Sequence, residues 1–349
     1  MESAKEIGGL TAVSREVPDD RTREIAPSLR PEIWPSVGQL LCLSNEELRG
    51  IDPLVMNLVV AKGIPCFADL DIGHYVRLAD QWASDIRHRL PRAEAHFHRS
   101  SANWKNDIRF FRLGIVCWYV DEVLGVTYPD ELADAEGDLY ADAMNVFLNG
   151  LMDRRRGSCA SMPTLHVAIG WRLGWPVSLA CAGTHLFCRY DDGEVIHNIE
   201  ATTFGRGGFR SHPDDCYREQ YRIPDIAVSC GSDLRAVTAR EMLGLFIAIR
   251  AFHHATVHEM REAEVGLLLA RHLFPTNRLL YGSQMEASIQ CGLRLFDRGE
   301  EGHPANVGHK LREWLRAPDY GNFWTTITTE TENANNDNAP GNQRIAAAW

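Results

Sequence analysis

Residues 153–159 read DRRRGSC, and residues 183–187 read GTHLF. The first run leads into a predicted helix that continues through Leu165 and Ile169 to Gly174, and Pro176 forbids its continuation. The first turn of a helix presents unpaired N–H groups and a partial positive charge, which stabilise an anion. Cys159 stands at this position, so we expect it to be a reactive thiol rather than a buried structural cysteine.

His185 opens the second run, at the head of a predicted strand. A thiol nucleophile needs a base within hydrogen-bonding reach, and an imidazole suits neutral pH. Short runs on either side of Asp191-Asp192-Gly193 predict a β-hairpin. A helix followed by antiparallel strands is typical of an α+β fold, in which the helix packs on the sheet and can bring Cys159 to His185.

A third polar group would hold the imidazole, and the hairpin register decides which residue that is. Side chains alternate faces along a strand. A loop over residues 190–193 would place Asn198 opposite His185, whereas a loop of Asp192-Gly193 alone would place Glu200 there. A loop of odd length would place Ile199 there, and its apolar side chain could not orient the ring.

Five runs resemble bacterial proteins of the transglutaminase-like superfamily: residues 147–159, 165–176, 183–187, 189–193 and 198–202. The resemblance implies a papain-like fold with a Cys–His–Asp or Cys–His–Asn arrangement. Cys159 matches the nucleophile and His185 the base. The family often has Asp-Pro where this chain reads Asn198-Ile199. We favour Asn198 as the third member, since it fits both the resemblance and the amide of papain-type sites, and we keep Glu200 as the alternative.

The segments around this core are predicted to be helical. Capping-box patterns begin at Ser44 and Thr238, and a further helix is expected to stop before Pro91. The prediction is a papain-like, transglutaminase-like α+β core flanked by helical subdomains. Its parts are a disordered segment 1–35, a helical subdomain 36–136, the core 137–232, a tetratricopeptide-like unit 233–322 and a disordered tail 323–349.

Composition narrows the function classes. The 349 residues are 45% hydrophobic and carry a formal net charge of −11, so general nucleic-acid binding is disfavoured. No run approaches the roughly 20 apolar residues of a membrane span, and residues 1–35 lack the apolar core of a secretory signal, which together favour the cytoplasm. The nine cysteines include no C-x-x-C pair, so we expect neither a metal site nor a cofactor.

The leading functional hypothesis is a thiol enzyme on amide or acyl substrates, a peptidase, amidase or acyl transferase, in which Cys159, His185 and Asn198 form the triad. A protein or peptide is the expected substrate class. The alternative is a catalytically silent scaffold whose C-terminal helices bind a partner protein.

Overall fold

The computed structural model describes residues 34–129, 132, 139–203 and 210–297. The predictions for residues 1–33 and 298–349 lie outside these residues, as does the boundary at 136–137. The elements, in chain order, are α1 (Val37–Cys42), α2 (Asn45–Arg49), α3 (Pro53–Ala61), η1 (Pro65–Phe67), α4 (Ile72–Ser100), η2 (Ser101–Trp104), α5 (Ile108–Trp118), η3 (Tyr119–Val123), α7 (Ala143–Val146), α8 (Leu148–Arg154), α9 (Ser161–Leu173), β1 (Val177–Ala182), β2 (His185–Asp191), β3 (Ile196–Ile199), η4 (Ala201–Thr203), α10 (Asp214–Gln220), α11 (Asp225–Ser229), α12 (Ala239–Thr256), α13 (Met260–Leu273) and α14 (Arg278–Asp297).

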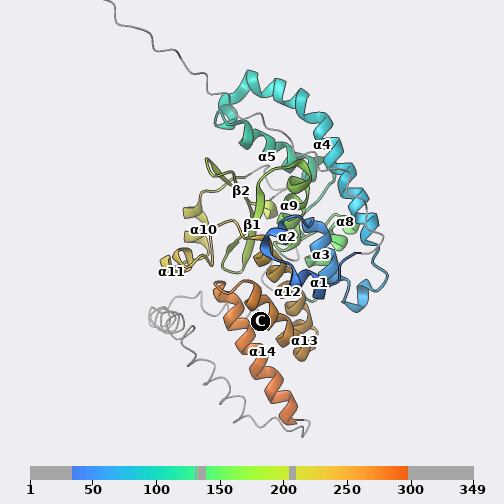
Figure 1. Cartoon of the computed structure of the whole chain (residues 1–349). Coiled ribbons are helices and arrows are strands. Elements are labelled where there is room, and N and C mark those ends of the chain that lie inside the picture. The colour runs from blue at the N-terminus through green and yellow to red at the C-terminus, as the bar shows by residue number, and fades with distance from the viewer. Residues whose placement is uncertain (1–33, 130–131, 133–138, 204–209, 298–349) are drawn as a thin grey trace, which may run out of the picture.

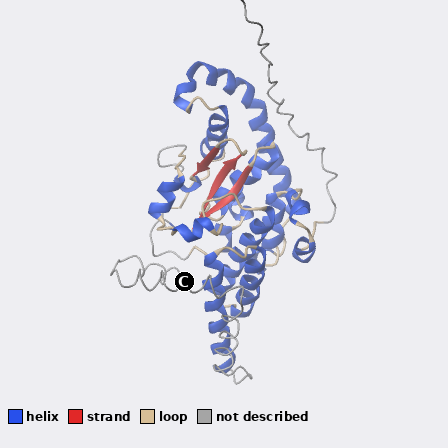
Figure 2. Cartoon of the chain, turned by 60° about the vertical axis from the view of Figure 1, so that its left-hand side comes forward, coloured by secondary structure: helices blue, strands red, loops and turns tan. Residues whose placement is uncertain are grey.

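A three-stranded antiparallel sheet in the order β1-β2-β3 lies in the middle of the molecule, with helices around it (Figure 2). One face carries Leu179, Cys188 and Ile199 into the main core, where α9 packs on β1 and β2. The other face carries Ala180, Ala182 and Phe187 into a smaller cluster with residues of the α10–α11 region: Tyr217, Ile223, Ala227 and Leu234. The expected α+β architecture, a helix packed on an antiparallel sheet, is confirmed.

The N-terminal helices begin where their sequence signals predict. Ser44 caps α2, with its hydroxyl accepting from the N–H of Glu47 while that carboxylate accepts from the Ser44 N–H. Asp52 caps α3 ahead of Pro53. Almost every residue of α3 is buried, which makes it a central helix between α9 and α12.

The prediction that a helix stops before Pro91 is wrong, since α4 continues through this proline to Ser100 (Figure 1). A proline inside a helix removes one hydrogen bond and crowds the preceding turn. Tertiary contacts of the second half of α4 offset this cost. Phe97 packs on Phe111 at 5.3 Å between ring centroids, and Glu94 pairs with Arg112 at 2.7 Å.

The segment that leads to Cys159 contains two short helices, α7 and α8. Phe147 between them is extended, with φ −110° and ψ 155°. The backbones on either side of this break approach so closely that a Cβ at Gly150 would collide with the Met144 backbone. Glycine is therefore required for α8 to fold back against α7.

The C-terminal helices α12, α13 and α14 pack on one another in sequence, and α12 also packs on α2 and α3. Thr238 caps α12 in the expected capping box with Glu241. In α13, the apolar residues Val265 and Leu268 are 52% and 40% exposed. That these helices are tetratricopeptide-like stays a prediction.

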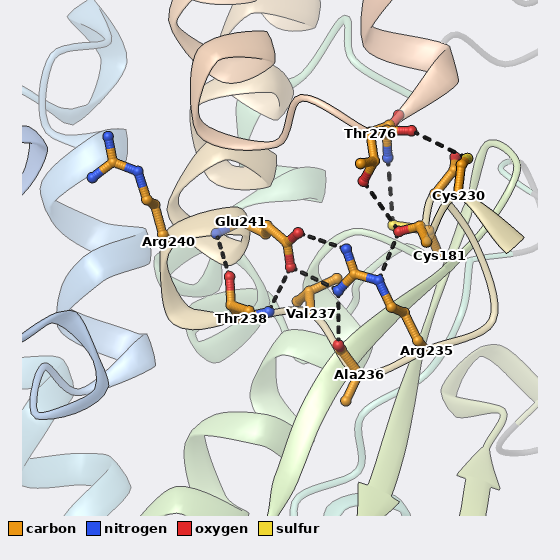
Figure 3. A network of polar contacts seen from close by, with 12 residues as sticks. Cys181, Cys230, Arg235, Ala236, Val237, Thr238, Arg240, Glu241 and Thr276 are labelled. Atoms are coloured by element: carbon orange, nitrogen blue, oxygen red, sulfur yellow. Dashed lines mark hydrogen bonds and ion pairs between the residues drawn. The ribbon is translucent and has the colours of Figure 1, made fainter. Parts of the chain in front are cut away.

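A polar network ties these helices to the sheet (Figure 3). Arg235 pairs with both oxygens of Glu241 and donates to the carbonyl of Gly231. Thr276, between α13 and α14, donates to the same carbonyl. Because the N–H of Val237 donates to Leu179 O in β1, the segment before α12 is fixed to the edge of the sheet.

Candidate active site

The backbone around Cys159 forms the first turn leading into α9. The hydroxyl of the fully buried Ser158 accepts from the N–H of Ala160, and its carbonyl accepts from the N–H of Met162. The hydroxyl of Ser161 accepts in turn from the N–H of Ser158. Cys159 therefore lies two residues before Ser161, where α9 begins, slightly earlier in the turn than the sequence predicts, and the residue is partly exposed.

The chain that enters this turn is held in place by the segment around Thr127. The N–H of Thr127 donates to the carbonyl of Arg155, and its carbonyl accepts from the N–H of Gly157. Arg155 ends α8 in the left-handed conformation, with φ 56°. At Gly157, a Cβ would lie 2.6 Å from the Leu151 side chain and 2.9 Å from the Ser161 hydroxyl, so no larger residue fits without movement.

His185 starts β2 directly after the tight turn Gly183-Thr184. Gly183 has φ +62°, and its N–H donates to the buried carboxylate of Asp233 at 2.5 Å. The imidazole is 7% exposed, and its Nε2 lies 2.7 Å from Oε2 of Glu200. The Cys159 side chain lies beside the same ring and raises the pKa of His185. Since Nε2 is occupied by Glu200, the nitrogen available to the thiol is Nδ1.

Glu200 follows the last residue of β3 and is 6% exposed. Its second oxygen, Oε1, accepts from the N–H of Thr202 at 3.0 Å and from the Thr202 hydroxyl at 2.6 Å. Both carboxylate oxygens are thus engaged, one by the imidazole and one by the first turn of η4. This arrangement fixes the carboxylate in the orientation that meets His185.

The charges of this pair favour ionised forms of both side chains. Burial disfavours the imidazolium, but the hydrogen bonds to Cys159 and Glu200 and the negative charges beside the ring outweigh burial and raise the pKa of His185 to about 10. Burial likewise opposes the charge of Glu200, yet the hydrogen bond and positive charge of His185 leave the pKa of Glu200 below its ordinary value.

Asn198 does not hold the imidazole, so the prediction that it orients His185 is wrong. Its Nδ2 donates to Asp214 at 2.7 Å, and its Oδ1 accepts from Arg189 at 3.1 Å. Glu200, the alternative, contacts the ring instead.

The pairing register of β2 and β3 explains why Asn198 does not reach His185. Asp191 pairs with Ile196, so the hairpin loop is residues 192–195, later than either predicted loop. The loop has even length, so Asn198 does share the face of His185. Continuing the register would bring Thr202 opposite His185, which leaves Asn198 four residues away, roughly 13 Å along the strand.

Two aromatic residues of the α10 segment lie over the imidazole and were not singled out in the sequence. Tyr221 stacks on His185 with ring centroids 5.0 Å apart and planes 8° apart. Tyr217, one turn earlier, lies 6.4 Å from His185 and stacks on Phe187 at 4.1 Å. Their spacing of four residues places both on one side of a helix, and this was the signal in the sequence that could have identified them.

The other histidines that cluster in the sequence have structural partners. His253 contacts a backbone carbonyl, His254 contacts the carboxylate of Glu259, and His197 contacts the carboxylate of Asp107. Within the described ranges, no group of three or more His, Cys, Asp or Glu side chains is arranged to hold a metal ion. Across the same ranges, no helix is long and apolar enough to cross a membrane.

Two cavities adjoin the site region without including its thiol or imidazole. The larger, about 260 Å³, is lined by residues that include Asn198, His212 and Asp214. The smaller, about 160 Å³, lies beside the segment that leads to Cys159 and is lined by residues that include Arg154 and Arg156.

Comparison with known protein families finds a match, and it covers the region that contains this site. Residues 77–244 match the family described as the transglutaminase-like superfamily. No curated protein and no solved structure matches the chain. The matched segment runs from the first turns of α4 into α12 and includes Cys159, His185 and Glu200. Residues 77–244 of this chain are therefore similar to a transglutaminase-like superfamily core.

Proposed function

We propose that this protein is a thiol enzyme that acts on amide or acyl substrates through Cys159, His185 and Glu200. The observation that carries the proposal is that one buried imidazole lies beside Cys159 and has the Glu200 carboxylate 2.7 Å from its Nε2. A nucleophile, a base and a group that orients the base are the three parts of such a site.

The geometry supports a defined sequence of steps. The Cys159 thiolate attacks the substrate carbonyl carbon, and the carbonyl electron pair moves to oxygen. The Cys159 backbone N–H, in the first turn before α9, is the natural donor to that oxyanion. When the tetrahedral intermediate collapses, the imidazolium of His185 gives its proton to the leaving amine, and a thioester remains on Cys159.

The second half of the reaction regenerates the thiol. His185, now neutral, takes a proton from water or from an acceptor amine as that group attacks the thioester carbonyl. Attack by water gives a peptidase or amidase, and attack by an amine gives an acyl transferase. Throughout both halves, Glu200 keeps the imidazole in one orientation and stabilises its positive charge.

Alkylation of the thiols tests this proposal without a known substrate. At a pH of about 6.5, limiting iodoacetamide should label Cys159 before the other cysteines, because few ordinary thiols are ionised there. Cys42, Cys66 and Cys216 are exposed and serve as internal reference thiols. Peptide mass spectrometry of partially labelled protein gives the relative rates.

Two variants separate reactivity from simple exposure. His185→Ala should bring the Cys159 rate down to that of the reference thiols, while the rates at Cys42 and Cys216 stay unchanged. An activated ester such as p-nitrophenyl acetate should leave an acetyl group on Cys159 in the wild type only. Equal labelling of all exposed thiols, with no effect of the His185 change, would instead support the silent scaffold with a partner at its C-terminal helices.

A further inference from the structure

We propose that Tyr221 is a positioning residue for His185, with a ring that holds the imidazole flat between Glu200 and Cys159. The proposal rests on the function argued above, because only a working thiol–imidazole pair needs a fixed base. The main observation in its support is that the rings of Tyr221 and His185 are stacked, with centroids 5.0 Å apart and planes at 8° to each other. Stacked rings in this geometry resist tilting of either partner.

Tyr221 is the more exposed of the two tyrosines that stack on the imidazole. Tyr217 is 2% exposed and belongs to the small apolar cluster with Phe187, whereas Tyr221 is only partly buried and packs against that cluster from outside. Burial raises the pKa of the Tyr221 hydroxyl, and the negative charges of Glu200 and Cys159 raise it further. Its ring therefore lies on His185 and within range of the charges of Glu200 and Cys159.

The start of α10 is anchored to the sheet by two buried side chains of neighbouring strands. The carboxylate of Asp214 accepts from Arg189 at 2.8 and 3.3 Å and from Nδ2 of Asn198 at 2.7 Å. Arg189 and Asn198 are 5% and 3% exposed and face each other in β2 and β3. Asn198 thus helps to locate the helix that carries Tyr221, although it does not touch His185.

The end of α10 fixes Tyr221 itself. The N–H of Tyr221 donates to Tyr217 O, and the N–H of Ile223 donates to Arg218 O across Arg222, which has φ +48°. This closing turn is a Schellman-type helix end. Ile223 is 4% exposed in the cluster with Phe187, so the chain is held on both sides of Tyr221.

The face of an aromatic ring attracts a cation, so Tyr221 should favour the imidazolium over the neutral ring. The groups that face the imidazole are Glu200 after β3, Cys159 before α9, and the two tyrosines of the α10 segment. The carboxylate and the thiolate also favour the cation, and the tyrosines carry no charge near neutral pH. Loss of the Tyr221 ring should therefore lower the pKa of His185 without removing its two hydrogen-bond partners.

The test compares Tyr221→Leu with Tyr221→Phe in the full chain. Leucine keeps apolar bulk but removes the ring plane, and phenylalanine keeps the ring. The imidazole C–H signals, followed by NMR through a pH titration and assigned with His185→Gln, report the pKa of His185 directly. Alkylation of Cys159 by iodoacetamide across the same pH range is the second readout.

We expect Tyr221→Leu to lower the alkylation rate near pH 6 by roughly three- to tenfold and Tyr221→Phe to stay within about twofold of the wild type. The pKa of His185 should fall in the leucine variant alone. The positioning role would be overturned if Tyr221→Leu kept the alkylation rate and the His185 pKa of the wild type. It would also be overturned if Tyr221→Leu and Tyr221→Phe lowered the alkylation rate equally. If Cys159 of the wild type reacts no faster than Cys42, the proposed function is refuted. The role of Tyr221 is judged separately, from the pKa of His185 in the two Tyr221 variants.

Discussion

The Glu200 carboxylate lies 2.7 Å from Nε2 of His185, and both side chains are less than 10% exposed. An ionic hydrogen bond between two buried groups is stronger than one in water, but either partner left alone would be costly. The hydroxyl and N–H of Thr202 complete the shell of the carboxylate. The pair therefore fixes both the orientation and the charge of the imidazole that meets Cys159.

Glu200→Gln should reduce the reactivity of Cys159 while preserving the shape of the site. An amide cannot stabilise the imidazolium by charge, so the pKa of His185 should fall by roughly 1–3 units. Iodoacetamide alkylation near neutral pH measures the effect. Asn198→Ala is the comparison: it removes bonds to Arg189 and Asp214 and should lower the free energy of unfolding by about 1–3 kcal/mol with a smaller loss of thiol reactivity. A larger loss of reactivity in the Asn198 variant would restore that residue as the orienting group.

The His185–Glu200 pair should stabilise the protein most between pH 4.5 and 6.5, and less at lower and at higher pH. The pKa of His185 is raised from 6.5 to about 10 on folding, so its contribution is complete below pH 6.5 and is lost as the pH rises toward 10. The pKa of Glu200 is lowered from 4.5, so its contribution is complete above pH 4.5 and is lost as the pH falls below that value.

Urea unfolding of the wild type and of His185→Gln at a series of pH values checks this dependence. The difference in free energy of unfolding between the two proteins should shrink steadily above pH 6.5. Parallel curves from pH 6.5 upward would show that His185 is not charged in the folded protein.

A buried ion pair at the far end of α9 should matter more for stability than an exposed one. Arg172 is 5% exposed and pairs with Asp52 at the start of α3 and with Asp80 of α4. Arg172→Gln leaves Asp52 buried without its cation and should cost about 3–5 kcal/mol. Arg49→Gln removes an exposed pair with Glu46 and should cost less than about 1 kcal/mol. Thermal or urea unfolding measures both, and equal costs would contradict the argument.

Two glycine-to-alanine changes should alter the free energy of unfolding in opposite directions. At Gly150, the added methyl group would collide with the Met144 backbone, and the change should destabilise the protein by about 1–3 kcal/mol or more. At Gly282 in α14, no atom lies within 4 Å of the added group. The helix interior favours alanine there by roughly 0.5–1 kcal/mol, so Gly282→Ala should raise the free energy of unfolding. A stabilising effect at Gly150 would show that α7 and α8 can separate.

Local signals in the sequence were enough to place Cys159 and His185 in the fold. A helix start is fixed by capping groups and neighbouring glycines within a few residues, and Cys159 lies just before one. A strand start is fixed by a tight turn, and His185 follows Gly183-Thr184. Strand parity also limited the third group to residues such as Asn198 and Glu200, because alternation of side chains is a property of every extended chain.

The choice between those two residues depended on contacts that no local pattern encodes. Oδ1 of Asp192 accepts from the N–H groups of Glu194 and Val195, and this closes the hairpin loop over residues 192–195 and sets the register. Asn198 is hydrogen-bonded to Arg189 and Asp214, whereas Glu200, one residue after β3 ends, is hydrogen-bonded to His185. Sequence alone thus determined that Cys159 lies just before a helix and His185 at the head of a strand, and it determined the α+β class, because these follow from short-range backbone geometry. Only the tertiary structure decided the hydrogen-bond partner of His185 and the ring stacked on it, because both come from segments whose approach depends on packing of the whole core.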